Sequence, residues 1–301
     1  MPPDLSVVIA SHDAAGVIAQ CLQALARQSG QPGVEVIVAD SSRDGTDTIV
    51  MDRFPDVRLL HFESALNVPE LRGKGIALTR GRIVAILDPY SIAAEDWAAS
   101  TIAAHAKVPN LVIGGSVDKD PSSDGGLLAW ALYFNEYGMF MSPGARGPVS
   151  IVPGSNVSYK RSHLFDGQRA RYEVFWKTFA NSQAQADGSP LWLEPAIRVG
   201  LNKPIPFGDF LRTRYFHGRC YAAMRVEGAS WPIRCLRALS TPLVPFLLYA
   251  RWTRVIWPKR QRRLSYLLTL PLQLALFSVW AFGELCGYLF GRGNACRRLF
   301  Y

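Results

Sequence analysis

The chain contains little cysteine and little histidine, and its last third contains almost no acidic residues. The five cysteines form no C-x-x-C motif and no cluster with histidines: Cys21, Cys220, Cys235, Cys286 and Cys296. This spacing indicates neither a disulfide framework nor a zinc site, and it is typical of a reducing compartment. The N-terminus has no basic segment followed by an apolar run, so we expect no cleaved signal peptide.

Composition and charge predict two regions with different surroundings. The 301 residues are 49% hydrophobic, 19% charged and 11% aromatic, which excludes a disordered or fibrous chain. Residues 211–301 hold 15 basic and 2 acidic side chains, whereas residues 1–210 hold 18 basic and 22 acidic ones. We therefore expect one domain over residues 1–210 and a second, basic region over residues 211–301.

Short apolar segments alternate with helical ones in the first ninety residues. Strands are expected at 5–10, 34–39, 57–62 and 83–87, with helices at 14–28, 45–53 and 69–80. Such strands pair in parallel through crossover helices, so the pattern predicts an α/β domain with a doubly wound sheet. Further along, we expect strands at 111–117 and 149–159 and a helix at 172–179. Ligands bind beyond the carboxyl ends of parallel strands, where this chain has polar residues at 11–13, 40–44 and 88–90.

The last third has the composition of membrane-associated helices. Residues 211–240 mix arginines with aromatic residues and leucines, as an interfacial helix does. Residues 264–290 contain one charge, Glu284, and are long enough to cross a bilayer. Basic residues flank this segment on both sides and set no orientation, so a single span, a hairpin bent at Pro271 and a half-inserted element all remain open. Membrane lipids are an expected partner, and nucleic acid is not.

Seven segments, in order from residue 5 to residue 219, carry a family resemblance. They are residues 5–13, 21–28, 36–46, 72–77, 81–88, 153–156 and 214–219. With these segments the chain resembles the family 2 glycosyltransferases. The resemblance implies a GT-A type, Rossmann-like, mostly parallel sheet with flanking helices, followed here by amphipathic and membrane helices. It also implies that a sugar is moved from a nucleotide-sugar donor to an acceptor with inversion.

The resemblance implies a donor site at the carboxyl edge of the sheet. Positions matching Ser11 and Asp40 line the nucleotide pocket in the family, and a carboxylate there accepts hydrogen bonds from the base or the ribose. The alternative for Asp40 is a strand-end residue that, with Asp44, caps the next helix. The remaining donor-binding candidates in this part of the chain are Arg72, Lys74, Asp88 and Asn156.

The metal ligands of the family are incomplete in this chain. Asp88 ends the fourth strand where relatives have Asp-x-Asp, but the chain reads Asp88-Pro89-Tyr90. The histidine that many relatives have after the last core strand is also missing, since residues 200–203 read Gly-Leu-Asn-Lys. Asp88 is therefore the one remaining candidate ligand for Mg²⁺ or Mn²⁺, and metal dependence is in doubt.

Basic side chains are the expected substitute for the missing ligands. Arg214, His217 and Arg219 lie in the segment that resembles the basic motif of the family, and fixed cations stabilise a leaving diphosphate. The alternative for Arg214 and Arg219 is binding to lipid phosphates.

Inverting transfer also needs a general base to take the proton of the acceptor hydroxyl. The resemblance places it after the Gly-x-Asn segment, where Glu173 stands among aromatic residues that exclude water. Asp187 and Glu194 are rival candidates, and a surface glutamate on an amphipathic helix is the alternative reading of Glu173.

Taken together, the sequence predicts a membrane-attached inverting glycosyltransferase. Its acceptor is expected to be lipid-linked or a surface polysaccharide at the cytoplasmic face of the inner membrane, with a cytoplasmic catalytic domain. A first alternative is a non-catalytic membrane scaffold or partner protein that keeps the fold but has lost its metal ligands. A second, a dinucleotide-binding oxidoreductase, is disfavoured because residues 11–16 read Ser-His-Asp-Ala-Ala-Gly where G-x-G-x-x-G is required.

Overall fold

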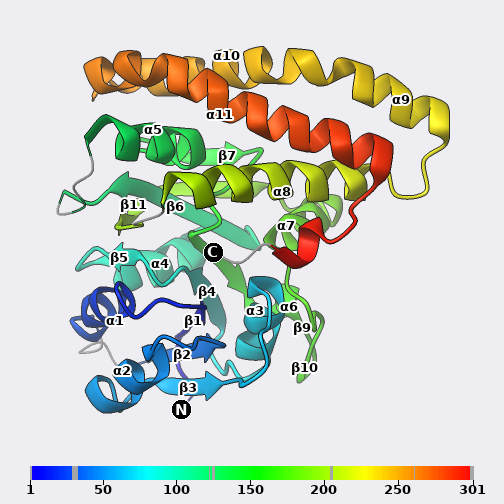
Figure 1. Cartoon of the computed structure of the whole chain (residues 1–301). Helices are drawn as coiled ribbons and strands as arrows, with labels where there is room; N and C mark the ends of the chain where they lie inside the picture. The colour runs from blue at the N-terminus through cyan, green and yellow to red at the C-terminus, as the bar shows by residue number, and fades with distance from the viewer. Residues whose placement is uncertain are drawn as a thin grey trace. The chain divides into compact units, whose positions relative to one another are not determined.

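The computed structural model describes residues 2–28, 33–121, 123, 126–203, 206–260 and 262–298. It divides the chain into two compact units (Figure 1). We call Met1–Ser123 with Phe140–Lys203 the sheet unit, and Asp124–Met139 with Pro204–Tyr301 the helical unit. Residues 124–139 thus cluster with the basic C-terminal region, although sequence analysis assigned them to the 1–210 domain.

A nine-stranded sheet is the centre of the sheet unit. Its order is β3-β2-β1-β4-β8-β6-β11-β5, and β7 pairs with β11 off this path. The strand bounds are β1 (Leu5–Ser11), β2 (Val34–Asp40), β3 (Arg58–His61), β4 (Ile83–Leu87), β5 (Ser91–Ala93), β6 (Val112–Lys119), β7 (Gly147–Val149), β8 (Asn156–Lys160) and β11 (Leu191–Leu201). The first four pair in parallel as predicted. Beyond β4 the sheet is mixed, because β8 runs antiparallel to both β4 and β6.

Helices follow the strands on both sides of the sheet. Their bounds are α1 (Ile18–Ala26), α2 (Thr46–Arg53), α3 (Val68–Ala77), α4 (Trp97–Lys107), α6 (Arg161–Leu164) and α7 (Lys177–Ala186); β9 (Phe165–Asp166) and β10 (Arg169–Ala170) form a separate hairpin. Helix α3 begins with a capping box, in which the Asn67 side chain accepts from the Glu70 N–H and the Glu70 side chain accepts from the Asn67 N–H. This cap fixes where α3 starts beneath the carboxyl edge of the sheet.

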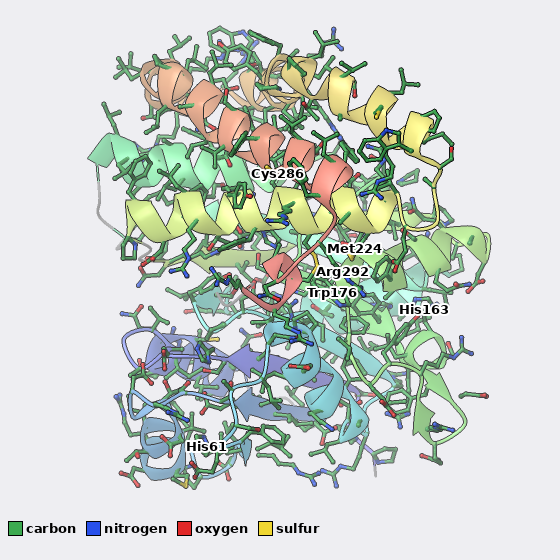
Figure 2. All side chains as sticks on the ribbon, turned by 45° about the vertical axis from the view of Figure 1, so that its right-hand side comes forward. His61, His163, Trp176, Met224, Cys286 and Arg292 are labelled. Atoms are coloured by element: carbon green, nitrogen blue, oxygen red, sulfur yellow. A yellow bond between two sulfur atoms is a disulfide. The ribbon has the colours of Figure 1, made fainter. Side chains whose placement is uncertain are left out.

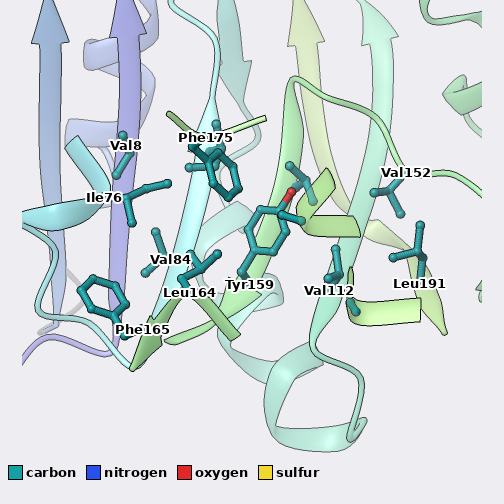
Figure 3. Packing of buried hydrophobic residues seen from close by; sticks show 14 residues of the cluster. Val8, Ile76, Val84, Val112, Val152, Tyr159, Leu164, Phe165, Phe175 and Leu191 are labelled. Carbon is teal, nitrogen blue, oxygen red and sulfur yellow. The ribbon is translucent and has the colours of Figure 1, made fainter. Parts of the chain in front are cut away.

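Two sequence predictions about local structure are wrong. The expected strand at 149–159 is two strands, β7 and β8, separated by residues 150–155. The expected helix at 172–179 begins only at Lys177, and residues 172–176 are a loop. The aromatic side chains that suggested a helix instead anchor this loop, since buried Phe175 packs edge-on against Tyr159 at 5.5 Å between ring centroids. Figure 3 shows Phe175 and Tyr159 in the core with Val8, Ile76 and Val84.

The helical unit consists of long helices with little else. Its elements are α5 (Gly126–Glu136), α8 (Phe207–Arg225), α9 (Trp231–Ser240), η2 (Thr241–Leu243), α10 (Val244–Ile256), η3 (Trp257–Lys259), α11 (Arg263–Phe290) and η4 (Ala295–Arg298). Helix α11 continues through Pro271 as one helix, so the chain does not form a hairpin there (Figure 1). Two segments are long and apolar enough to cross a membrane, Trp231–Lys259 and Arg263–Phe290.

The helical unit also corrects the expectation about cysteines. Cys220 on α8 and Cys296 on η4 form a disulfide, although they are 76 residues apart in sequence. Cysteine spacing cannot reveal such a pair, because the fold and not the local motif brings the two side chains together.

Candidate functional site

Three side chains meet Asp88 where β4 ends. The guanidinium Nη2 of Arg72, on α3, donates to Asp88 Oδ1 at 2.9 Å, and Lys177 Nζ, at the start of α7, lies 3.5 Å from the same oxygen. The Tyr90 hydroxyl donates to Asp88 Oδ2 at 3.1 Å. The side chains of Arg72, Asp88 and Lys177 are only 10–11% exposed. A fourth residue, Lys203, places Nζ 4.8 Å from the Tyr90 ring centroid. We call Arg72, Asp88, Lys177 and Lys203 the cation cluster.

The cation cluster carries more positive than negative charge. Burial raises the pKa of Asp88, but the charges of Lys177, Arg72 and Lys203 outweigh it and lower this pKa to about 2. Burial, with the nearby charge of Arg72, lowers the pKa of Lys177 to about 7, against the opposing effect of Asp88. Asp88 is therefore ionised at neutral pH, and one carboxylate faces three basic side chains.

Some polar atoms around the cation cluster have no partner in the described structure. Buried Arg72 is 8% exposed and its Nε makes no hydrogen bond, and the same holds for Oγ of fully buried Ser155. Next to Ser155, Gly154 is exposed, and a side-chain carbon at that position would lie 3.5 Å from Lys177 Nζ. The cluster thus has unused donors next to an exposed stretch of backbone.

The residues around Asp88 do not fit a divalent metal ion. Mg²⁺ and Mn²⁺ take oxygen ligands, usually more than one carboxylate among them. Asp88 is the only acid of the cluster, and both of its oxygens already accept from Arg72 and Tyr90. No group of three His, Cys, Asp or Glu side chains suited to a metal occurs within the described ranges.

The ends of β1 and β2 form a second polar region of the sheet unit. Ser11 and Asp40 are register partners there, and both are fully buried. Asp40 Oδ2 accepts from the Ser42 N–H at 3.1 Å and lies 2.8 Å from Nδ1 of His61, while Asp40 Oδ1 accepts from the Ser42 hydroxyl. Asp40 therefore organises its own loop, whereas Ser11 Oγ has no partner in the described structure.

Lys74 and Asn156 are two further donor-site candidates. Lys74 is exposed on α3, because residues two apart on a helix point in nearly opposite directions and Arg72 is the one that faces inward. Asn156 is 1% exposed. Its two amide hydrogens go to the carbonyls of Ser116 and Ile197, both at 2.9 Å, and its oxygen accepts from Trp97 Nε1 at 2.9 Å. Asn156 thus joins α4, β6 and β11 and has no amide hydrogen left for a ligand.

The three acidic candidates for the general base differ in their surroundings. Glu173 is exposed in the loop before α7, four residues from Lys177. Glu194 is buried, and its Oε2 accepts from Nε of Arg146 at 2.6 Å and lies 2.6 Å from Nη2 of the same side chain. Asp187 is exposed and accepts from Gln183 at 2.8 Å. A base needs a carboxylate that an acceptor hydroxyl can reach, which favours Glu173 and Asp187 over Glu194.

The basic candidates Arg214, His217 and Arg219 all lie on α8 in the helical unit. Arg214 forms an ion pair with Glu136 of α5 at 3.2 Å, and both side chains are largely buried. Arg219 Nε donates to the Gly291 carbonyl at 3.0 Å, and the His217 ring lies near Trp280 of α11. These contacts hold the helices of this unit together. Figure 2 labels Cys286, near the C-terminal end of α11, and Arg292, which follows that helix.

Sequence reasoning missed Lys177 and Lys203 as members of the site. Lys177 stands at the start of α7, which was expected to begin earlier, and Lys203 was noted only as part of a segment without histidine. The sequence offered one indirect signal for them. The second acid of the Asp-x-Asp motif and the histidine after the last core strand are both missing, which leaves room for basic side chains around Asp88.

Comparisons with known proteins agree with the geometry of the sheet unit. Residues 6–165, more than half of the chain, match the model of glycosyl transferase family 2. The chain is 27% identical over 206 residues to succinoglycan biosynthesis protein ExoO of Rhizobium meliloti (strain 1021), an alignment covering 66% of this chain and 53% of that protein. The chain thus spans about half the length of this curated relative.

Solved structures share the fold at low sequence identity. The mannosyltransferase PcManGT from Pyrobaculum calidifontis, in complex with GDP-Man and Mn²⁺, superimposes with a TM-score of 0.56 and 18% identity, over 99% of this chain and 87% of that one. TarS 1-349 of S. aureus, in complex with UDP-GlcNAc, gives a TM-score of 0.54 and 13% identity, over 97% and 93%. The fold is of the GT-A type, and the chain belongs to glycosyltransferase family 2.

Proposed function

We propose that this glycosyltransferase moves a sugar, with inversion, from a nucleotide-sugar donor to a lipid-linked or surface-polysaccharide acceptor at the cytoplasmic face of the inner membrane. The observation that carries the proposal is the cation cluster, which gathers excess positive charge at the carboxyl edge of the sheet. Ligands of doubly wound sheets bind at this edge, and a donor diphosphate needs positive charge there. Ser11 and Asp40, at the ends of β1 and β2, are proposed to receive the nucleoside.

Glu173 is our proposed general base. It is exposed, and its backbone lies against Gly73, next to Arg72 of the cation cluster. A carboxylate near the donor that remains open to an acceptor hydroxyl is what an inverting displacement requires. In this proposal the acceptor oxygen attacks the anomeric carbon, its proton passes to Glu173, and the nucleoside diphosphate leaves with the bonding electrons.

The helical unit supports a membrane-bound acceptor. Two of its segments are long and apolar enough for a membrane, and residues 211–301 hold 15 basic against 2 acidic side chains. Such a unit keeps the enzyme where lipid-linked and polysaccharide acceptors are made. The similarity to a succinoglycan biosynthesis protein is consistent with a polysaccharide product.

The proposal is tested by transfer assays on the full chain in membranes. Membranes are incubated with radiolabelled UDP-, GDP- or dTDP-sugars, and the anomeric configuration of the product is read by NMR. We expect one donor to be used with inversion, and Glu173→Gln to lower turnover about 10²–10⁴-fold. Asp187→Asn is the matched control and should retain turnover. Retention of configuration would exclude the inverting mechanism, and full activity of Glu173→Gln would exclude this base.

One observation favours a second function, that of a non-catalytic membrane scaffold. Both oxygens of Asp88, the carboxylate that the family resemblance implies as a metal ligand, accept hydrogen bonds from Arg72 and Tyr90. Donor binding without turnover on any acceptor fraction would support this alternative, whereas donor-dependent product would exclude it.

A further inference from the structure

We propose that Arg72, Lys177 and Lys203 bind the donor diphosphate directly and take the place of a divalent cation. This rests on the proposed function, since it names the groups that receive that donor. It gives residues of the sheet unit the stabilisation of the leaving diphosphate, which the sequence predicted for Arg214 and Arg219.

The charge balance of the cation cluster is the first argument. Two buried basic side chains, Arg72 and Lys177, lie at one carboxylate, so when all three groups are ionised they keep an excess of one positive charge, and the charge of Lys203 adds to the positive potential at Asp88. Buried charge without a counter-ion is costly, and Asp88 can neutralise only one of these two buried cations. A diphosphate supplies the missing negative charge.

Unused hydrogen-bond donors are the second argument. Arg72 is 8% exposed, and its Nε has no partner in the described structure. The buried Ser155 hydroxyl is in the same situation, and it follows Gly154, whose exposed backbone lies beside Lys177. Phosphate oxygens accept hydrogen bonds strongly from such groups, and a guanidinium matches two of them at once.

The competing explanation is a purely structural ion cluster. If Lys177 only neutralised Asp88, Lys177→Met would remove a needed counter-ion and lower the melting temperature, with no effect on anion binding. If the function of Lys177 is to bind an anion, its ammonium group is repelled by Arg72 and Lys203 as long as no anion is bound. Lys177→Met should then leave the melting temperature unchanged or higher and weaken anion binding. The two explanations predict opposite results in both measurements.

The test is calorimetry on the full chain with UDP, GDP and inorganic pyrophosphate, in EDTA and then with Mn²⁺. We expect at least one of these probes to bind in EDTA, with affinity changed less than about threefold by Mn²⁺. Lys177→Met and Lys203→Met should each weaken binding roughly ten- to a hundredfold, the loss of one charge-assisted hydrogen bond. Lys177→Arg should largely retain it. Lys107→Met, at an exposed site on α4, is the matched control and should bind like the parent.

Binding that requires Mn²⁺, or unchanged binding by Lys177→Met, would overturn the proposal. The outcomes separate it from the proposed function. Transfer activity that disappears with EDTA overturns the direct cation contact and leaves glycosyl transfer standing. Metal-free, Lys177-dependent binding without any product supports the cluster and argues against transfer.

Contacts within the helical unit carry a second, independent proposal: we infer that α11 lies in the plane of one membrane leaflet containing anionic lipids and does not cross the bilayer. Helices α8 and α11 touch through their backbones at three levels. A side chain at Gly218, Gly283 or Gly287 would collide with a backbone carbonyl of the other helix. Nearer its start, α11 donates from Gln273 to the Ala131 carbonyl of α5 at 2.6 Å.

Helix α8 does not fit into hydrocarbon. Its 19 residues include Asp209, Arg212, Arg214, Arg219 and Arg225, and charged groups at the centre of a bilayer are costly. Since α11 packs on α5 and α8 over most of its length, α11 cannot cross the membrane without taking α8 along. Figure 1 shows α11 approaching α8 towards the C-terminal end of α11, where Gly283 and Gly287 lie.

The surface of α9, η2, α10 and α11 suits a leaflet. Large apolar side chains there are 56–79% exposed: Trp231, Leu236, Leu239, Leu243, Phe246, Leu247, Leu264, Leu268, Phe282 and Phe290. Arginines stand among them, several over aromatic rings, such as Arg263, whose Cζ lies 4.7 Å from the ring centroid of Trp257. Apolar groups that enter the leaflet, with arginines at headgroup depth, are typical of in-plane helices on anionic lipid.

Thiol labelling at the two ends of α11 tests this arrangement. Arg262→Cys and Arg292→Cys, at two exposed basic positions that flank α11, are made separately in the full chain with Cys235→Ser and Cys286→Ser, and spheroplasts are treated with an impermeant maleimide. We expect neither end to react until the membrane is permeabilised, and the protein to sediment with membranes after a high-salt wash. Labelling of one end in intact spheroplasts would show a span. Flotation of the full chain with neutral and anionic vesicles tests which lipid is bound. Equal binding to both kinds of vesicle, or a stable dimer that binds neither, would exclude the anionic leaflet as the partner.

Discussion

The two units hold their positive charge in opposite ways. In the sheet unit, Arg72 and Lys177 are about nine-tenths buried around Asp88, in fixed geometry. In the helical unit, Arg251 and Arg254 are exposed, and Arg251 lies over the ring of Trp252 at 6.0 Å. Buried cations select one anion of matching shape, whereas exposed arginines attract any anionic surface. The net charge of the first 210 residues is negative, so it does not reveal the buried basic side chains around Asp88.

The largest effect is expected where buried charge is uncovered. Asp88→Asn leaves Arg72 and Lys177 without their carboxylate, which should lower the free energy of unfolding by about 3–5 kcal/mol. Urea denaturation measures this change. Asp96→Asn is the matched control, because Asp96 pairs with Arg198 at 3.8 Å on the surface and should cost less than about 1 kcal/mol. An equal loss of unfolding free energy in Asp88→Asn and Asp96→Asn would show that burial does not change the cost of removing the carboxylate.

A slightly smaller loss is expected for Asn156→Ala. The substitution leaves Trp97 Nε1 and the carbonyls of Ser116 and Ile197 unpaired in the core, at a cost of roughly 2–4 kcal/mol. Donor affinity per folded molecule should not change, because no amide hydrogen of Asn156 is available to a ligand. A selective loss of nucleotide binding at full stability would instead support the donor-binding role that the family resemblance implies.

The third prediction concerns pH and the sheet unit. Burial, with a smaller effect of Lys160, lowers the pKa of His105 to about 3 from 6.5. Between these values the unfolded chain binds a proton that the folded chain does not, so stability falls as the pH is lowered through 6.5 towards 3. The loss from pH 7 to pH 5 is about 2 kcal/mol. His105→Gln should flatten the curve, and an unchanged slope would show that other groups cause it.

The smallest effect on stability is expected on the outer surface of the helical unit. Leu239 is 79% exposed, so Leu239→Ser should change the free energy of unfolding by less than about 0.5 kcal/mol. If this surface enters a leaflet, the same variant should bind anionic vesicles roughly ten- to a hundredfold more weakly in flotation assays. Ala223→Ser on α8 is the control. A large loss of stability would mean that Leu239 packs inside the protein.

The sequence predicts the parallel half of the sheet well because its signals are local. Buried runs such as Leu5–Ser11 and Ile83–Leu87 have the composition of strands, and their polar ends mark the edge where ligands bind. The Asp40 loop follows the same logic, since Asp40 and Ser42, which hydrogen-bond to each other, are neighbours in the chain. Arg72 and Asp88, both candidate donor-binding residues from the sequence, form a buried ion pair.

The rest depends on contacts between distant residues. Lys177 reaches Asp88 across 89 positions, and Cys220 reaches Cys296 across 76, so neither pair has a local signature. Asn156 matched a family motif, but only its three partners on other elements show that its amide is used inside the core. Periodicity also misplaced the start of α7, because the aromatic residues at 172–176 anchor a loop by tertiary packing and not by helical spacing.

Gly73 limits how this sequence can change. Any side chain there would run into the backbone carbonyl of Glu173, on the loop that leads to Lys177. The adjoining Phe175 N–H donates to the Pro69 carbonyl at 2.8 Å, which ties the loop to the start of α3 a second time. The loop and α3 therefore constrain each other, and we expect an insertion in either one to displace Arg72 relative to Lys177. In a saturation mutagenesis screen for function, position 73 should accept no residue other than glycine, while the neighbouring exposed position 74 should accept many.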